Sequence, residues 1–301
     1  MFKRVILFLL LNFLVVMTIS IVLSLFSIRP YLNAHGIDYS SLLAFCFIWG
    51  MGGAVISLLL SRWMARFAAG VRLIDPKTID PQEKHLLELV YQLARKVGIS
   101  KMPQVGIFPA RELNAFATGP SKNRSLVAVS SGLLEKMDEE ELKAVLGHEI
   151  SHIANGDMVT MTLLQGVVNA FVLFLSRVLA FALSGMGKNR GESSRGNAMS
   201  FYLFSYLFEI VFMILGSLLV CAYSRYREFR ADAGGASLVS KQAMIGALQT
   251  LESYQKIRDP KTEASPIAAF KISHPSRKGL FHLFATHPPI EERIARLQKN
   301  F

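Results

Sequence analysis

The apolar positions of this chain are concentrated in long runs rather than spread evenly. Four such runs lie at about residues 5–28, 41–60, 159–184 and 199–223. Each is long enough to cross a hydrocarbon core, which takes about 20 apolar residues in a helix. The first run is longer than the usual apolar region of a signal peptide, about 7–15 residues, and no small-residue cleavage site stands out. The pattern therefore predicts four transmembrane helices, the first of them a retained anchor.

Basic residues near the ends of these spans predict their orientation. They are Lys3 and Arg4 before the first span, and Arg62, Arg66 and Arg72 after the second. By the positive-inside rule, both termini and the segment 62–158 belong in the cytoplasm. The loop between the third and fourth spans is also basic, which mildly violates the rule. We expect a transmembrane hairpin at 1–61, a cytoplasmic part at 62–158, a second hairpin at 159–223 and a second cytoplasmic part at 224–301.

The polar parts of the chain have shorter periodic segments. Residues 83–97 have apolar positions at helical spacing and end at Gly98, and residues 237–257 and 290–298 also favour helices. Three short strands are expected at 104–108, 113–119 and 125–129. Residues 259–286 are rich in Pro, Ser and Lys and show no regular period. The fold class is therefore a mainly α membrane protein with a cytoplasmic α+β part that contains a small β-sheet.

A further helix is expected directly after the third strand. Asp138 followed by three glutamates is typical of an N-cap with a capping box, and Asn155-Gly156 is a plausible end. His148 and His152 are four positions apart, so they lie on one face of this helix. Two imidazoles so placed can share one Zn²⁺, with Glu149 beside an open coordination position as a general base. On this motif alone, a surface helix with two solvated histidines remains an alternative.

A second candidate group follows the fourth span. Glu228 and Asp232 are four positions apart on the expected cytoplasmic extension of that helix. Glu228 can supply a third zinc ligand, and Asp232 can accept the far imidazole N–H of a ligating histidine. A solvated charged helix would be the better interpretation without the two histidines upstream.

For each of three other features, the sequence leaves two interpretations open. The strand segment Asn114 to Thr118 is either a substrate-binding sheet edge or ordinary core and turn. His287, before the last helix, is either a transition-state donor or a surface histidine. Arg177 and Glu209 fall inside the third and fourth spans, and they either pair or reach an interface.

The net charge of +11 admits a nucleic-acid binder, but no compact basic module or aromatic-basic interleaving is present. We therefore expect no nucleic-acid partner, and anionic lipid headgroups of a bilayer explain the charge more simply. The two cysteines, Cys46 and Cys221, lie inside expected spans and offer neither a disulfide framework nor a plausible zinc site.

Several segments together resemble the gluzincin membrane metallopeptidases. They are His148-Glu149-Ile150-Ser151-His152, Glu228-Phe229-Arg230-Ala231-Asp232, the hydrophobic hairpin between them, Asn114-Ala115-Phe116-Ala117, and Thr286-His287-Pro288-Pro289. The resemblance covers nearly the whole chain, has no departure at the metal positions, and is strongest to bacterial heat-shock proteases related to the CAAX prenyl protease. It implies a gluzincin-like protease domain and one Zn²⁺ per chain on His148, His152 and Glu228. It also implies a quality-control role on misfolded or damaged membrane proteins in the bacterial inner membrane.

The resemblance adds weight to Asn114, Ala115, Phe116 and Ala117 as a substrate edge and to His287 as a cleft residue, which we expect to be catalytic. The leading hypothesis is a zinc metalloendopeptidase in which Glu149 takes a proton from water and passes it to the leaving amine. A zinc-stabilised membrane scaffold that cuts nothing is the alternative. Glu149 argues against it, because a structural zinc site has closed coordination and no use for a base.

Overall fold

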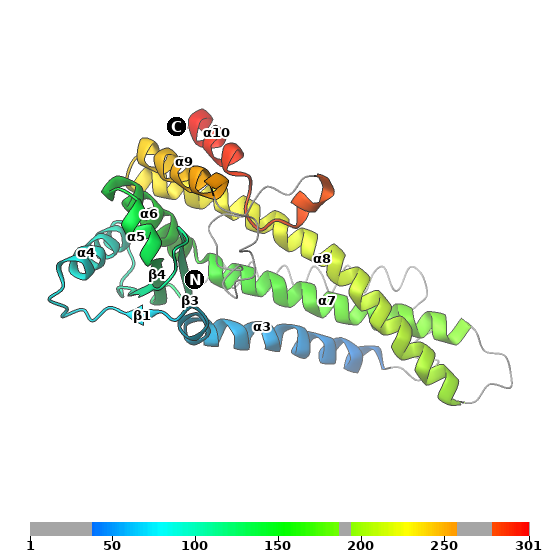
Figure 1. Cartoon of the computed structure of the whole chain (residues 1–301). Helices are drawn as coiled ribbons and strands as arrows, with labels where there is room; N and C mark the ends of the chain where they lie inside the picture. Colours follow the sequence, from blue (N-terminus) through cyan, green and yellow to red (C-terminus); the bar gives the residue numbers. More distant parts are fainter. Residues whose placement is uncertain (1–37, 187–193, 258–278, 301) are drawn as a thin grey trace. The chain divides into compact units, whose positions relative to one another are not determined.

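A computed structural model describes residues 38–186, 194–257 and 279–300, and these are mostly helical (Figure 1). The chain divides into two compact units, each made of two stretches that are distant in sequence. The first unit comprises Met1–Ile56 and Thr160–Leu219, and the second comprises Ser57–Val159 and Val220–Phe301. The expected first span, residues 5–28, lies outside the described residues.

Among the described residues, three helices are long and apolar enough to span a membrane. They are α3 (Tyr39–Ala69), α7 (Asp157–Met186) and α8 (Ser194–Leu238). These helices confirm the three later apolar runs as helical. Helix α8 has 45 residues. At about 1.5 Å per residue it is about twice as long as the roughly 30 Å hydrocarbon core, so it cannot lie wholly inside such a core. Most of its charged residues are in its last turns.

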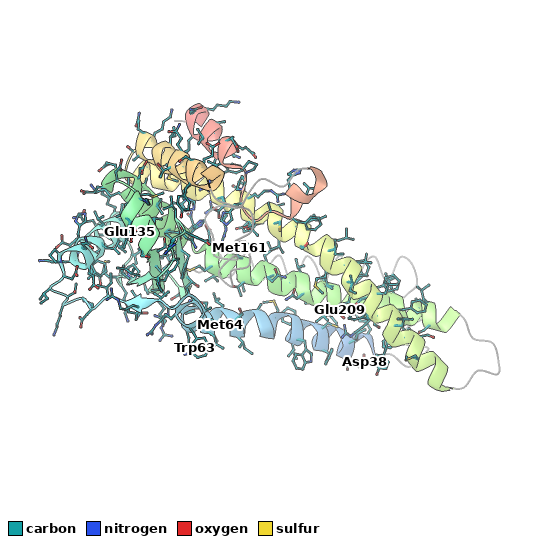
Figure 2. The ribbon with its side chains drawn as sticks, in the orientation of Figure 1. Asp38, Trp63, Met64, Glu135, Met161 and Glu209 are labelled. Carbon is teal, nitrogen blue, oxygen red and sulfur yellow. The ribbon has the colours of Figure 1, made fainter. Side chains whose placement is uncertain are left out.

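Among the described residues of the first unit, apolar contacts and an ion pair join the helices. Tyr39 of α3 meets Phe174 of α7 edge-on, with ring centroids 5.6 Å apart. Arg177 Nη1 of α7 lies 3.9 Å from Glu209 Oε2 of α8 and also donates to the carbonyl of Leu173 at 2.9 Å. Figure 2 labels Glu209 on α8. Of the two interpretations for these charged residues, the structure supports pairing.

The second unit contains a four-stranded mixed sheet. Its strands are β1 (Arg72–Leu73), β2 (Gln104–Phe108), β3 (Ala115–Ser121) and β4 (Arg124–Ser130). Their order is β1-β2-β4-β3; β2 and β4 are parallel, and the other pairs are antiparallel. The three predicted strands are confirmed to within two residues, and β3 is an end strand of the sheet. Strand β1 was not predicted, because two residues are too short to show a period.

The described part of this unit also contains the end of α3, the last turns of α8 and six further helical segments. They are α4 (Pro81–Lys96), α5 (Ser131–Lys136), α6 (Glu139–Asn155), α9 (Lys241–Ile257), the 3-10 helix η3 (Gly279–Phe284) and α10 (Ile290–Asn300). The prediction that one helix starts at residue 237 was wrong. Helix α8 continues to Leu238, and α9 starts after Ser240, whose hydroxyl accepts the N–H of Ala243 at 3.0 Å. This serine cap is a local stop signal that hydrophobic periodicity does not show.

Helix α6 is the central element of the second unit. It contacts α4, α9, β3 and β4, and from Ala144 to Ile153 its side chains are buried. Leu146 and Ile150 are fully buried in a core that also includes Val90 of α4 and Leu248 of α9. Because α6 is surrounded in this way, its two histidines are held on a rigid element rather than on a solvated face.

Candidate metal centre

Local sequence signals fix both ends of α6. Asp138 accepts the N–H of Glu141 at 2.8 Å, and the Glu141 side chain returns to the N–H of Asp138, so the predicted capping box is confirmed. Gly156 ends the helix with a left-handed φ of 65°, which a glycine adopts without strain. The next residue, Asp157, already belongs to α7. Only Gly156 therefore separates α6 from α7.

The two histidines face one point in space. His148 Nε2 and His152 Nε2 are 3.1 Å apart, and the two rings are perpendicular. Both side chains are buried, with 3% and 9% of their surface exposed. Two imidazole nitrogens that face each other at this distance need a proton or a cation between them. The alternative of two solvated histidines is therefore excluded.

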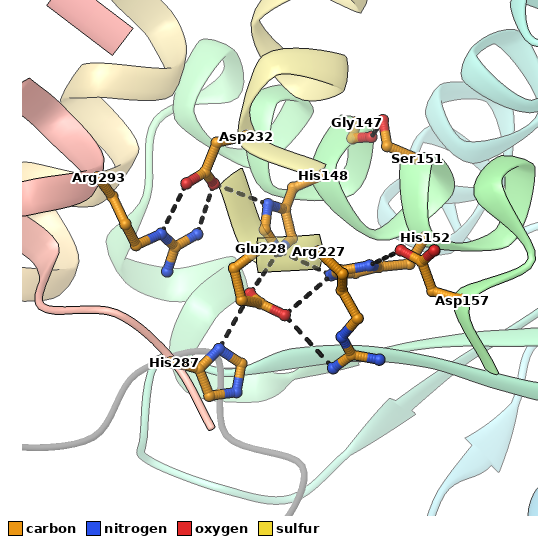
Figure 3. A network of polar contacts seen from close by, with 10 residues as sticks. All are labelled: Gly147, His148, Ser151, His152, Asp157, Arg227, Glu228, Asp232, His287 and Arg293. Carbon is orange, nitrogen blue, oxygen red and sulfur yellow. Dashed lines mark hydrogen bonds and ion pairs between the residues drawn. The ribbon is translucent and has the colours of Figure 1, made fainter. Parts of the chain in front are cut away.

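Helix α8 brings Glu228 to the same point (Figure 3). Its two carboxylate oxygens lie 3.4 Å from His148 Nε2 and 3.4 Å from His152 Nε2. Glycines allow this approach, because a Cβ on Gly234 would lie 2.3 Å from Ser151 Oγ and one on Gly235 would lie 3.1 Å from the backbone nitrogen of His148. Helices α6 and α8 therefore cross closely enough to unite residues 80 positions apart.

Each histidine is oriented by its own carboxylate. Asp232 Oδ1 lies 2.9 Å from Nδ1 of His148. Asp157 Oδ2 lies 2.8 Å from Nδ1 of His152. A carboxylate on Nδ1 keeps that nitrogen protonated and turns Nε2 toward the shared point as an electron-pair donor. The role of Asp157 was not predicted, although its position directly after the helix stop was a usable signal.

Two arginines and a histidine surround this cluster. The buried Arg293 of α10 binds Asp232 with two hydrogen bonds, Nε to Oδ2 at 2.8 Å and Nη2 to Oδ1 at 2.5 Å. Arg227 Nη2 lies 3.3 Å from Glu228 Oε1, and His287 Nδ1 lies 2.9 Å from Glu228 Oε2. His287 is therefore not a remote surface histidine. Neither arginine was predicted, because nothing local in the sequence connects either one to the histidines.

The charge balance favours a bound cation. Burial lowers the pKa of His148, but Asp232 and Glu228 more than offset it and raise that pKa to about 9. Burial raises the pKa of Asp232, yet Arg293 and His148 lower it to about 2. Burial likewise raises the pKa of Glu228, but His287 and His152 bring it well below its usual value. The carboxylates of Asp232 and Glu228 therefore remain ionised, and they hold a proton on His148 until a metal cation displaces it.

The donor set fits a metal ion. His148, His152 and Glu228 each offer one ligand atom, and these atoms lie within 4.8 Å of one another. Both oxygens of Glu228 are buried and accept no hydrogen bond of ordinary geometry from any residue that the structure describes. Two imidazole nitrogens and one carboxylate are a common ligand set for Zn²⁺.

The remaining predicted residues lie on neighbouring elements. Glu149 is buried on α6, and its charge acts on Arg293. Asn114 precedes β3, and Ala115, Phe116 and Ala117 lie on it; this strand contacts α6. Most of this segment is buried, with Asn114, Ala115 and Phe116 each less than 5% exposed.

The fold and the metal centre describe a membrane metallopeptidase. The sequence model of peptidase family M48 matches residues 80–300, so the chain belongs to this family and is a metalloprotease. It is 49% identical to a protease HtpX homolog of Bacillus subtilis (strain 168), over 99% of both chains. It is also 46% identical to protease HtpX of Acinetobacter baumannii (strain AYE), over 98% of both chains. The predicted resemblance to bacterial membrane metalloproteases is confirmed.

A solved structure supports the fold independently. The crystal structure of S. mikatae Ste24p is similar with a TM-score of 0.60, over 97% of this chain and 67% of that chain. The two sequences are only 16% identical, so this likeness concerns the fold alone.

Proposed function

We propose that this metalloprotease is a zinc endopeptidase whose metal is held by His148, His152 and Glu228. The convergence of two distant helices on one buried N, N, O donor set carries the proposal. A zinc ion in this position would supply Lewis acidity, lowering the pKa of a water and polarising the scissile carbonyl. Asp232 and Asp157 hold the two imidazoles in the tautomer that such an ion needs.

Glu149 is the general base and acid of this proposal. It follows a metal-ligating histidine directly on α6, and its side chain is only 5% exposed. Its carboxylate would take a proton from the attacking water and then deliver it to the leaving amine. His287, 2.9 Å from Glu228, would donate a hydrogen bond to the oxygen that gains charge in the transition state.

Strand β3 is the proposed substrate edge. It is an end strand of the sheet and contacts α6, the helix that carries Glu149. An extended polypeptide added beside Asn114 to Ala117 would therefore run close to the metal.

The membrane setting makes misfolded or damaged membrane proteins the proposed substrates. We further propose four spans, with the second cytoplasmic part at residues 224–301 and both termini and the protease domain on the cytoplasmic side of a bacterial inner membrane. The basic flanks of the first two spans support this orientation. The apolar helices support the lipid partner: Ile48 and Trp49, inside the second expected span, are 66% and 63% exposed on α3.

The proposed zinc endopeptidase activity is tested by comparing cleavage and zinc content between the wild type and three variants. Detergent-purified protein is incubated with unfolded β-casein, with and without added zinc. Glu149→Ala should reduce cleavage by about 10²–10⁴ while zinc content stays unchanged, which is the usual size of a general acid–base contribution. Glu228→Ala should lose zinc, and Glu135→Ala, an exposed glutamate on α5, should match the wild type.

Near-normal cleavage by Glu149→Ala would remove it as the base. A zinc-loaded wild-type protein that never cuts casein or any unfolded membrane protein would instead be a scaffold. Loss of zinc from Glu135→Ala would show that the metal measurement reports general damage rather than ligation.

A further inference from the structure

One face of α8 carries four side chains that can form hydrogen bonds, spaced three or four residues apart. Cys221, Arg225, Glu228 and Asp232 follow at spacings of four, three and four residues, which keeps them on one side of a helix. Glu228 belongs to the metal centre and Asp232 orients His148. The first two side chains of this face have no role in the chemistry described so far.

The C-terminal segment binds this face in the same order. Arg225 Nη1 donates to the carbonyl oxygens of Leu283 at 2.7 Å and Ala285 at 2.8 Å, and Cys221 Sγ donates to that of Phe284 at 3.3 Å. His287 then meets Glu228, and Arg293 binds Asp232. Residues 283–293 therefore lie along α8 as a parallel strip, in contact at each turn of the helix.

We propose that Arg225 is a positioning residue that seats His287 beside the metal centre. The proposal rests on the proposed catalytic role of His287. The two N–H groups of Nη1 serve two carbonyls at once, and the second of these carbonyls belongs to a residue only two positions before His287. Arg225 fixes the backbone on the N-terminal side of His287, and the Arg293–Asp232 pair fixes it on the other side.

The segment needs such an anchor because its own backbone offers little. Between η3, which ends at Phe284, and α10, which starts at Ile290, no helix or strand forms. Pro288 and Pro289 follow His287 and have no N–H to donate. Side chains from α8 therefore take the place of a hydrogen-bonded ladder. A displacement of about 1 Å at a catalytic group can reduce a rate by about 10²-fold.

Kinetics of zinc-loaded protein on β-casein test the proposal. His287→Ala should reduce kcat by about 10²-fold, the usual loss for one transition-state donor. Arg225→Ala should reduce kcat by about tenfold, with KM and zinc content near wild type. Because Arg225 acts through His287, the double variant should be no slower than His287→Ala. Arg95→Ala, an exposed arginine on α4, is the matched control and should change nothing.

Arg225→Lys separates the effect of the two hydrogen bonds from the effect of the positive charge. A lysine keeps the positive charge but lacks the planar fork, so it should restore kcat only in part. Full activity of Arg225→Lys and a further loss in the double variant would each overturn the proposal. If Arg225→Ala does not fold, Arg225→Lys, alone and combined with His287→Ala, carries the same test.

Hydrogen–deuterium exchange tests whether Arg225 holds the segment before His287, and it does so without any substrate turnover. In the Glu149→Ala background, Arg225→Ala should speed amide exchange at residues 283–287 at least tenfold, whereas amides in α6 should keep the wild-type rate. Unchanged exchange at residues 283–287 would show that Arg225 does not position this segment, even if activity fell. Normal activity of His287→Ala, together with faster exchange in Arg225→Ala, would instead remove the proposed catalytic role of His287. The conclusion that Arg225 holds residues 283–287 in place would remain.

Discussion

The two histidines of the metal centre have the same chemistry but are held in different ways. His152 is oriented by Asp157, five residues along the chain, whereas His148 is oriented by Asp232, 84 residues away. Asp157 lies in the first turn of α7, where the helix N-terminus favours negative charge. Asp232 lies inside α8, and its charge is compensated by Arg293. One half of the site is therefore local, and the other depends on three segments meeting.

Removing Arg293 should have the largest effect, because it acts on the half of the site that contains His148 and Asp232. Arg293→Met leaves Asp232 as a buried charge without its guanidinium, and breaking such a pair is destabilising by about 3–5 kcal/mol. We expect a lower thermal midpoint and loss of zinc. Lys299→Met, on the exposed side of α10, is the control and should cost less than about 1 kcal/mol. An unchanged midpoint in Arg293→Met would show that Asp232 does not depend on it.

The two orienting carboxylates can be compared directly. Asp157→Asn and Asp232→Asn should each weaken zinc binding by about 10–100-fold, measured by competition with a chelator. The loss should be larger for Asp232→Asn, because that change also leaves Arg293 without its partner charge. Equal losses would mean that the two halves of the site are held in the same way.

The close crossing of α6 and α8 gives a third test. Gly234→Ala places a Cβ 2.3 Å from Ser151 Oγ, and such overpacking is destabilising by about 1–3 kcal/mol. Because the helices must separate, we also expect weaker zinc binding. Ser151→Gly removes the side chain that clashes, so the double variant should recover affinity relative to Gly234→Ala. A Gly234→Ala protein with normal affinity would show that Glu228 reaches the metal without this close contact.

A pH dependence of the zinc-free protein gives a further test. The pKa of His148 is raised to about 9 from an ordinary 6.5 by Asp232 and Glu228 against the effect of burial. The protonated His148 therefore stabilises the fold fully below about pH 6.5, and this stabilisation is lost as pH rises through 9. Thermal midpoints of chelator-treated protein should fall over that range. The fall should be weaker in His148→Gln and in zinc-loaded protein, where the metal replaces the proton.

Much of the architecture followed from local patterns. Apolar runs predicted the three described membrane helices, and Asp138 with Gly156 marked both ends of α6. The strands were found because apolar residues flank clear turn residues. Strand β1 and the break at Ser240 were missed, because two residues show no period and a single serine cap does not interrupt a hydrophobic pattern.

By itself the sequence determined the pairs that share a helix face. His148 with His152 and Glu228 with Asp232 lie four residues apart, so helix geometry alone aligns each pair. Only the tertiary structure decided that the two pairs meet, that Asp157 and Arg293 support them, and that Arg225 holds the chain before His287. The physical reason is range: backbone periodicity fixes neighbours within a few turns, whereas contacts between distant segments depend on how whole helices pack.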